Sequence, residues 1–164
     1  MNLRDSFSMR QRPRGLFKWM LRLPVPLFRM RLGWIFGERF VLITHRGRRS
    51  GTLHQTPVEV VQHDGPGHEY IVCSGTGPTA DWYRNLVSSP AVEIQVRNRH
   101  WEPAQRMLDN VEAARRFHTY ETLHPRTAGR LLRTMGRSYD GSDAGRVAMM
   151  ASMPMVAFSD QPRR

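Results

Sequence analysis

Short apolar runs rich in β-branched and aromatic residues, each ended by a compact turn, constrain this fold more than any other feature. Such runs favour β-strands, and the glycine, proline and aspartate between them favour turns. We expect strands over residues 40–45, 53–62, 69–74, 91–96, 100–107 and 155–158. The first two are joined by the turn 46–51, so they predict a hairpin with a long basic tip.

Helical patterns are inserted between these strands and follow them. We expect helices over residues 80–88, 109–124, 126–136 and 142–152. Thr79 is placed to cap the first, and Asp109 with Glu112 has the spacing of a capping box for the second. Pro57 cannot donate to a strand ladder, so we expect it at a bulge or an edge. Strands joined mainly by turns, with helices inserted and appended, predict an α+β fold with a mostly antiparallel sheet or barrel.

The charge of the chain points to anionic ligands. The 25 lysine and arginine residues exceed the 14 acidic ones to give a net charge of +11, and Lys18 is the only lysine. Arginine keeps its charge and binds phosphate or carboxylate with a planar fork of donors. Charge alone leaves three classes of partner open: nucleic acid, an anionic membrane and a phosphate-bearing cofactor. The length of 164 residues suits a single domain.

Other kinds of site lack their signatures. Cys73 is the only cysteine, which excludes an internal disulfide and a metal site built from several cysteines. The histidines have no metal-site spacing, and we find neither the hydrolase nucleophile-elbow motif nor the zinc-protease helix motif. No secretory signal is visible, so we expect a reducing, cytoplasmic setting.

The N-terminal part differs in composition from the rest. We expect a disordered basic segment over residues 1–15, an amphipathic arm over 16–37 and the compact domain over 38–160. Cations alternate with Leu, Phe, Trp and Met in the arm, which Pro24 and Pro26 break. Its uncharged stretches are shorter than the roughly 18 apolar residues that span a bilayer. Two interpretations stay open: a helix in an anionic membrane interface, at the inner face of the plasma membrane, or a helix packed on the domain.

The turn Gly47-Arg48-Arg49-Ser50-Gly51 has the composition of an anion-binding loop. Glycine at both ends lets successive backbone N–H groups face one anion. The two guanidinium groups and the serine hydroxyl add further donors, which together suit one phosphate. A solvated hairpin tip would have the same composition, so the spacing alone leaves both interpretations open.

Residues 75–80 (GTGPTA) match the G-x-G-x-x-A pattern of dinucleotide-binding folds. The strands before it read as hairpin-linked, and the helix after it is short for a parallel crossover. Glu93 lies inside a strand rather than at the end of one, so no acidic residue stands at the required distance. We therefore expect no dinucleotide fold, although glycine here would still permit close approach of a ligand.

Residues 42–51 (LITHRGRRSG), then Thr56-Pro57 and residues 81–86 (DWYRNL) before Pro90, resemble the deazaflavin-dependent nitroreductase family. That family's pattern is a T-x-x-G-R-[KR]-S-G turn, a proline a few residues later, and a W-Y-x-N-L helix before a proline. The two motifs in this order are fairly specific together, and the similarity covers about residues 40–158. The resemblance implies a split β-barrel like that of flavin-binding pyridoxamine-phosphate-oxidase-like proteins. It also implies an oxidoreductase that transfers a hydride from reduced coenzyme F420 to a quinone-like or nitroaromatic acceptor.

The resemblance also implies roles for single residues. The cofactor contacts would be Arg48, Arg49, Ser50, Gly51, His54, Thr56, Pro57, Cys73, Ser74, Gly75, Trp82 and Asn85. The first four would hold the phosphate and guide the acidic tail, Trp82 would pack against the cofactor, and Asn85 would join its helix to the loop. Trp82, Asn85 and Cys73 have structural interpretations as well, as a buried stripe, a bridge and a small core residue. The residues assigned to the acceptor side are Glu59, His124 and Tyr139.

Three positions depart from the family pattern. His54 stands where relatives commonly have arginine, Gly75 where some have lysine, and Glu59 where some have tyrosine. Two alternatives therefore remain: an FMN-binding split barrel and a membrane-surface binding protein without catalysis. A nucleic-acid module is disfavoured because no RNA-binding or helix-turn-helix signature occurs. The oligomeric state, a dimer included, is left open.

Overall fold

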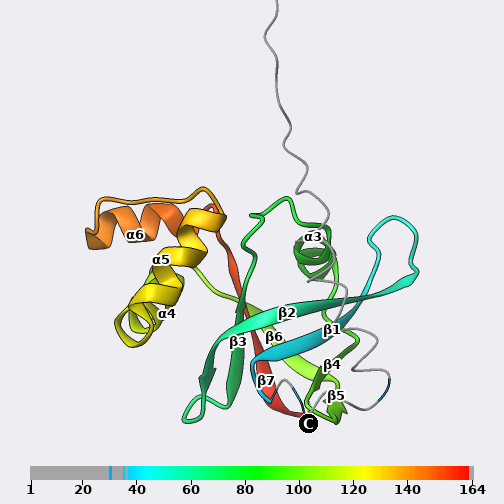
Figure 1. The fold of residues 1–164 in the computed structure, drawn as a ribbon. Coiled ribbons are helices and arrows are strands. Elements are labelled where there is room, and N and C mark those ends of the chain that lie inside the picture. Colours follow the sequence, from blue (N-terminus) through cyan, green and yellow to red (C-terminus); the bar gives the residue numbers. More distant parts are fainter. Residues whose placement is uncertain (1–29, 31–34, 36, 163–164) are drawn as a thin grey trace, which may run out of the picture.

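The computed structural model describes residues 30, 35 and 37–162 of the chain. The predicted disordered segment 1–15 and nearly all of the predicted arm 16–37 lie outside the described residues. In chain order the elements are β1 (Phe40–Arg46), β2 (Leu53–Asp64), β3 (Glu69–Cys73), α3 (Asp81–Ser88), β4 (Glu93–Val96), β5 (Arg99–Trp101), β6 (Pro103–Met107), α4 (Asn110–Leu123), α5 (Pro125–Thr134), α6 (Asp143–Met150) and β7 (Met155–Pro162), as Figure 1 shows.

The strands form one antiparallel sheet in the order β5-β4-β1-β2-β3-β7-β6. Its two end strands, β5 and β6, are adjacent in the chain and separated only by Glu102. The indole of Trp101 at the end of β5 donates to the carbonyl of Ser159 on β7 at 2.9 Å. This contact brings the two ends of the sheet together, so the sheet is a nearly closed barrel and the predicted α+β split barrel is confirmed.

Strand β2 bends and pairs with a different strand in each half of the barrel. Residues 53–59 pair with β1, residues 60–64 pair with β3, and the register shifts between Val60 and Gln62. Pro57 lies opposite Leu42, in the half that precedes the pairing with β3. Its missing N–H therefore removes no bond of the β2–β3 ladder, which agrees with the predicted edge position.

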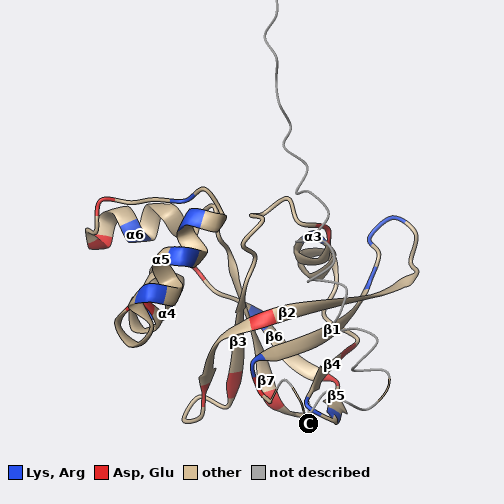
Figure 2. Cartoon of the chain, viewed as in Figure 1, with Lys and Arg blue, Asp and Glu red and all other residues tan. Residues whose placement is uncertain are grey.

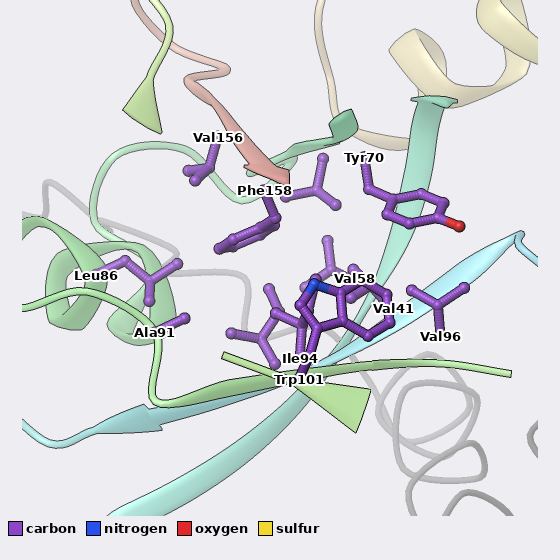
Figure 3. Close-up of a cluster of buried hydrophobic side chains, with 12 residues drawn as sticks. Val41, Val58, Tyr70, Leu86, Ala91, Ile94, Val96, Trp101, Val156 and Phe158 are labelled. Atoms are coloured by element: carbon purple, nitrogen blue, oxygen red, sulfur yellow. The ribbon is translucent and has the colours of Figure 1, made fainter. Parts of the chain in front are cut away.

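Alternate residues of β3 and β7 fill two separate cores. Tyr70 and Val72 of β3 point into the barrel with Val156 and Phe158 of β7. The close-up in Figure 3 shows this interior, where Trp101 and the α3 residue Leu86 lie among the strand side chains.

The other face of β3 and β7 is covered by helices. Ile71, Met155 and Ala157 on that face pack with Phe117 of α4 and Met150 of α6. Figure 1 shows α4, α5 and α6 gathered on this side of the barrel, whereas α3 lies apart from them. Among the described residues, no helix has the length and apolarity needed to cross a bilayer.

Of two predictions about helix starts, one was wrong and one was half right. Thr79 does not cap α3, because the N-cap is Ala80 and its side chain makes no capping bond. The Asp109 carboxylate does accept from the Glu112 N–H, but the Glu112 carboxylate accepts from Arg106 and Arg116 instead of completing the box.

The expected strand 100–107 is in fact two strands. β5 ends at Trp101 and pairs with β4, whereas β6 begins at Pro103 and pairs with β7. The sequence does carry one local sign of this break, Pro103 directly after Glu102, which the expectation of a single strand overlooked. The remaining helices and strands lie within a few residues of their predicted bounds, the largest difference being that β7 continues to Pro162.

Candidate functional site

The basic turn between β1 and β2 is closed by its own hydrogen bonds. The N–H of Gly47 donates to Thr52, and the N–H of Gly51 donates to Gly47, both at 2.8 Å. Gly51 has a φ of +69°, and a Cβ at position 47 would lie 2.7 Å from the Ser50 hydroxyl oxygen. The positive φ therefore favours glycine at position 51, whereas a side chain at position 47 would displace that of Ser50.

Arg48 fixes the turn to helix α3. Its backbone N–H and its Nη1 donate to Oδ1 of Asn85 at 3.1 and 3.0 Å, and its Nη2 donates to Asp81 at 3.0 Å. Asn85 is buried, and these bonds join its helix to the loop as predicted. The Asp81 side chain is 84% exposed, and its ion pair adds little to stability.

Arg49 differs from its neighbour because its side chain is exposed. In the part of the chain that the structure describes, no carboxylate pairs with Arg49, and the N–H groups of Arg49 and Ser50 have no acceptor. Figure 2 shows basic residues at this tip of the β1–β2 hairpin and an acidic residue at the start of α3. The turn thus offers a free guanidinium and two free amides at one place.

A hollow of about 590 Å³ lies between this turn, β2 and α3. Its lining comes from the turn, from the facing strand residues, from the loop after β3 and from α3. The residues are His45, Gly47, Arg48, Arg49, Ser50, His54, Gln55, Thr56, Thr76, Ala80, Asp81, Trp82 and Asn85. Segments that are up to 40 residues apart in the sequence therefore share one surface.

The hollow brings together seven of the residues predicted to contact a cofactor. These are Arg48, Arg49, Ser50, His54, Thr56, Trp82 and Asn85. Gly51, Pro57, Cys73, Ser74 and Gly75 are not among the lining residues, and a cofactor role for them stays a prediction. Trp82 is half-buried against the barrel core, so its ring serves the core as well as the hollow.

His45 is a lining residue that sequence reasoning missed. It is buried, with Nε2 3.0 Å from the Thr56 hydroxyl and Nδ1 3.1 Å from the amide nitrogen of Asn85. Burial lowers its pKa to about 4, with the neighbouring His54 adding to this effect and Asp81 opposing it. His45 is therefore neutral at pH 7. Its position inside an apolar strand gave no sign of these partners.

Residues 73–75 and Gly77 pack away from the hollow, whereas Thr76 between them lines it. Burial raises the pKa of the Cys73 thiol to about 12, and its Sγ donates to the Met153 carbonyl at 3.5 Å. Cys73 therefore belongs to the outer core, and Ser74 is buried with its hydroxyl on the Gly77 carbonyl at 2.7 Å. A Cβ on Gly75 would meet the side chain of Met135. The two glycines of the G-x-G-x-x-A match thus leave room for residues that follow α5. They are not part of a dinucleotide-binding fold, which is not present here.

The three residues predicted for the acceptor side lie apart from the hollow. Glu59 pairs with Arg39 at 3.3 Å, and His124 is exposed between α4 and α5. The Tyr139 hydroxyl donates to Glu121 and lines a second hollow of about 400 Å³ next to α6. An acceptor role for these three residues stays a prediction.

Among the described residues, no cluster of three or more His, Cys, Asp or Glu side chains is placed to hold a metal ion. The geometry beside α3 instead combines hydroxyls, an indole, and a guanidinium and amides that have no partner within residues 37–162. Such a set suits an anionic group attached to a flat ring.

Residues 30–138 match the family model described as F420H(2)-dependent quinone reductase. The chain belongs to this family. It is therefore an oxidoreductase that uses coenzyme F420, as the sequence motifs implied.

Three solved structures are similar to this quinone reductase family member. A chain described as an F420-H2 dependent reductase (FDR-A) is 20% identical, with 75% of this chain and 96% of that chain covered and a TM-score of 0.49. A chain described as a domain-swapped dimer is 20% identical, with 75% and 81% covered and the same TM-score. A Clostridium acetobutylicum protein related to general stress protein 26 of B. subtilis, of the pyridoxinephosphate oxidase family, is 10% identical, with 82% and 83% covered and a TM-score of 0.41.

The residues around the hollow fit the cofactor of the family. Coenzyme F420 carries a phosphodiester and a flat deazaflavin ring, and its acidic tail adds further negative charge. Arg49 and the amides of the turn supply unused donors for an oxyanion, and Trp82 supplies a flat apolar wall. Asp81, which also lines the hollow, has its charge offset by Arg48.

Proposed function

We propose that the hollow between the turn 47–51 and α3 is where this reductase binds coenzyme F420, and that a quinone-like or nitroaromatic compound is its electron acceptor. One observation carries the proposal: the hollow gathers seven of the residues implied by the family motifs from two distant segments. The family match supports the cofactor and the quinone class of acceptor.

The residues of the turn have different roles in binding the cofactor. The Arg49 guanidinium and the backbone N–H groups of Arg49 and Ser50 face the phosphate, because these donors have no acceptor among the described residues. The Ser50 hydroxyl lies 2.7 Å from the hydroxyl of Thr52. Arg48 keeps the turn in place through Asn85, so it acts on the cofactor by positioning its neighbours. Trp82 forms a wall for the ring.

The protein itself needs to do little chemistry. Reduced F420, when bound, supplies a hydride to the acceptor. The chain's own residues hold the ring and the acceptor in contact and reduce the access of water to them. Neutral donors that face the ring, such as the Thr56 hydroxyl, stabilise charge at the ring's polar edge.

The test is an assay with two candidate cofactors and a panel of acceptors. Oxidation of reduced F420 and of reduced FMN is followed by absorbance, with a menaquinone analogue, a benzoquinone and a nitroaromatic compound as acceptors. We expect turnover with reduced F420 and at least one quinone, and much slower turnover with FMN. Efficient turnover with FMN alone would contradict the cofactor assignment, and no turnover with any quinone or nitro compound would contradict the acceptor class.

We also infer that the segment 16–37 attaches the enzyme to an anionic membrane surface. The sequence supports this, since the first 37 residues hold eight of the 25 cations and only one acidic residue, Asp5. Trp19, Trp34 and several Leu and Phe residues accompany these cations, which is typical of a helix in a membrane interface.

A further inference from the structure

A chain of hydrogen bonds crosses the candidate site from the basic turn to the cavity side of β2. It begins at Arg48, whose N–H and Nη1 both point at Oδ1 of Asn85. It continues from Nδ2 of Asn85 to Nδ1 of His45 at 3.1 Å, and from Nε2 of His45 to the Thr56 hydroxyl at 3.0 Å. His45 and Asn85 are buried, at 3% and 4% exposed.

The direction of every bond in this chain follows from its first member. Arg48 can only donate through these two groups, so the Asn85 atom that faces them has to be the carbonyl oxygen. The Asn85 NH₂ group then faces Nδ1 of His45 as a donor, and Nδ1 has to accept. A neutral imidazole has one N–H, which therefore lies on Nε2 and donates to the Thr56 oxygen.

This direction leaves one hydrogen unused. The Thr56 oxygen already accepts from His45, and its own hydrogen has no acceptor among the residues that the structure describes. Thr56 lines the hollow beside α3. A hydroxyl that cannot donate back along the chain is held as a donor toward the hollow.

We propose that Thr56 binds the cofactor through its hydroxyl, which donates to a carbonyl oxygen or ring nitrogen of the deazaflavin, and that His45 is the positioning residue that makes this hydroxyl a donor. The inference rests on the proposed function, because it needs the ring to lie in this hollow. The pyrimidine edge of a deazaflavin carries several such acceptors and is the part of the ring that gains from a fixed donor.

The same chain links the donor to the protonation state of His45. An imidazolium has N–H groups on both nitrogens, so Nδ1–H would face the NH₂ of Asn85 and the bond would be lost. The charged and titratable groups around His45 are His54, stacked at 5.8 Å between ring centroids, and Asp81 and Arg48 on the far side of Asn85. Protonation of His45 therefore both disfavours the contact with Asn85 and loosens the turn.

The first measurement is the tautomer of His45 in the free protein. Nitrogen-15 NMR of histidine-labelled protein reports which ring nitrogen carries the proton. We expect the proton on Nε2 in the wild type and in Thr56→Val, and a mixture of tautomers in Asn85→Leu because the donor to Nδ1 is gone. A proton on Nδ1 in the wild type would overturn the direction of the chain, and this outcome needs no variant to fold.

The second measurement is the affinity for oxidised F420. Thr56→Val keeps the β-branched shape but removes the hydroxyl, and we expect about tenfold weaker binding. Thr56→Ser restores a hydroxyl and is expected to bind within about twofold of the wild type. Thr119→Val on α4, whose hydroxyl donates to Arg115, is the matched control for loss of a threonine hydroxyl away from the hollow.

Equal affinity of Thr56→Val and the wild type, with Arg49→Ala still weakened, would overturn this inference and leave the proposed cofactor site intact. Equal affinity of all three proteins would instead overturn the cofactor site itself. The two failures are therefore distinguishable in one set of titrations.

Discussion

At the scale of single residues, burial strongly affects the pKa of His45. Burial disfavours the charged form of this histidine, and its pKa is therefore lowered to about 4 from the ordinary 6.5. Between these two pH values the unfolded chain binds a proton at this residue and the folded protein does not. The free energy of unfolding therefore falls as the pH decreases through this range, and this contribution stops changing below about pH 4.

The corresponding prediction concerns the pH dependence of stability. The gap between about 4 and 6.5 sets an upper limit of about 3 kcal/mol on the loss. We expect His45→Gln to lose less stability than the wild type between pH 6.5 and pH 4, measured by urea unfolding at several pH values. His118→Gln, at an exposed position of α4, is the control and should follow the wild type. Identical pH dependence in all three proteins would show that His45 titrates normally.

At the scale of elements, the loop after β3 is shaped by the helical layer. Gly77 has a φ of +89°, and a Cβ there would lie 3.3 Å from the Ser152 carbonyl oxygen and 3.6 Å from Nη2 of Arg137. A Cβ at position 75 would meet the side chain of Met135. The loop that supplies Thr76 to the hollow is therefore held from behind by residues that follow α5 and α6.

We expect Gly77→Ala to lower the free energy of unfolding by about 1–2 kcal/mol, because a side chain is disfavoured at this positive φ. Gly65→Ala is the matched control, since Gly65 lies in a turn where a Cβ meets nothing within 4 Å. The measurement is denaturant unfolding of both variants. A Gly77→Ala protein as stable as Gly65→Ala would contradict the strained geometry of the loop.

The elements differ in how far the sequence predicted them. The strands and the basic turn were predicted because alternating apolar residues and bracketing glycines are local signals. The break between β5 and β6 at Glu102 was missed. The partner strand changes there from β4 to β7, and this change depends on how the barrel closes. His45 was missed for a similar reason, since its partner Asn85 lies 40 residues away in the sequence. The predicted helix cap at Thr79 was wrong because α3 starts at Asp81, one residue later than predicted, so the N-cap is Ala80.

At the scale of the whole molecule, charge is unevenly divided. Residues 38–164 hold 17 cations and 13 acidic residues, so most of the net charge of +11 belongs to the first 37 residues. The barrel alone is thus only mildly basic, and we expect its anion affinity to be concentrated at the turn 47–51. Cofactor binding and membrane attachment are expected to be separable functions of two parts of the chain.

Removal of residues 1–37 tests this separation. We expect the truncated protein to bind F420 within about twofold of the full chain, and to lose binding to vesicles that contain phosphatidylglycerol. Binding of the full chain should weaken as salt is raised, because it depends on exposed charges. Sedimentation with vesicles gives the measurement, and pure phosphatidylcholine vesicles are the control. Equal vesicle binding by both proteins would assign the membrane contact to the barrel instead.

The central claim is that the turn 47–51 receives the anionic group of the cofactor, and a fluorescence titration with oxidised F420 tests it most directly. Loss of a charge-assisted hydrogen bond costs about 1.5–3 kcal/mol, so Arg49→Ala should bind roughly ten- to a hundredfold more weakly than the wild type. Arg115→Ala, which removes an exposed cation of α4, should bind as tightly as the wild type. Equal weakening by the two variants, or none by Arg49→Ala, would contradict the assignment.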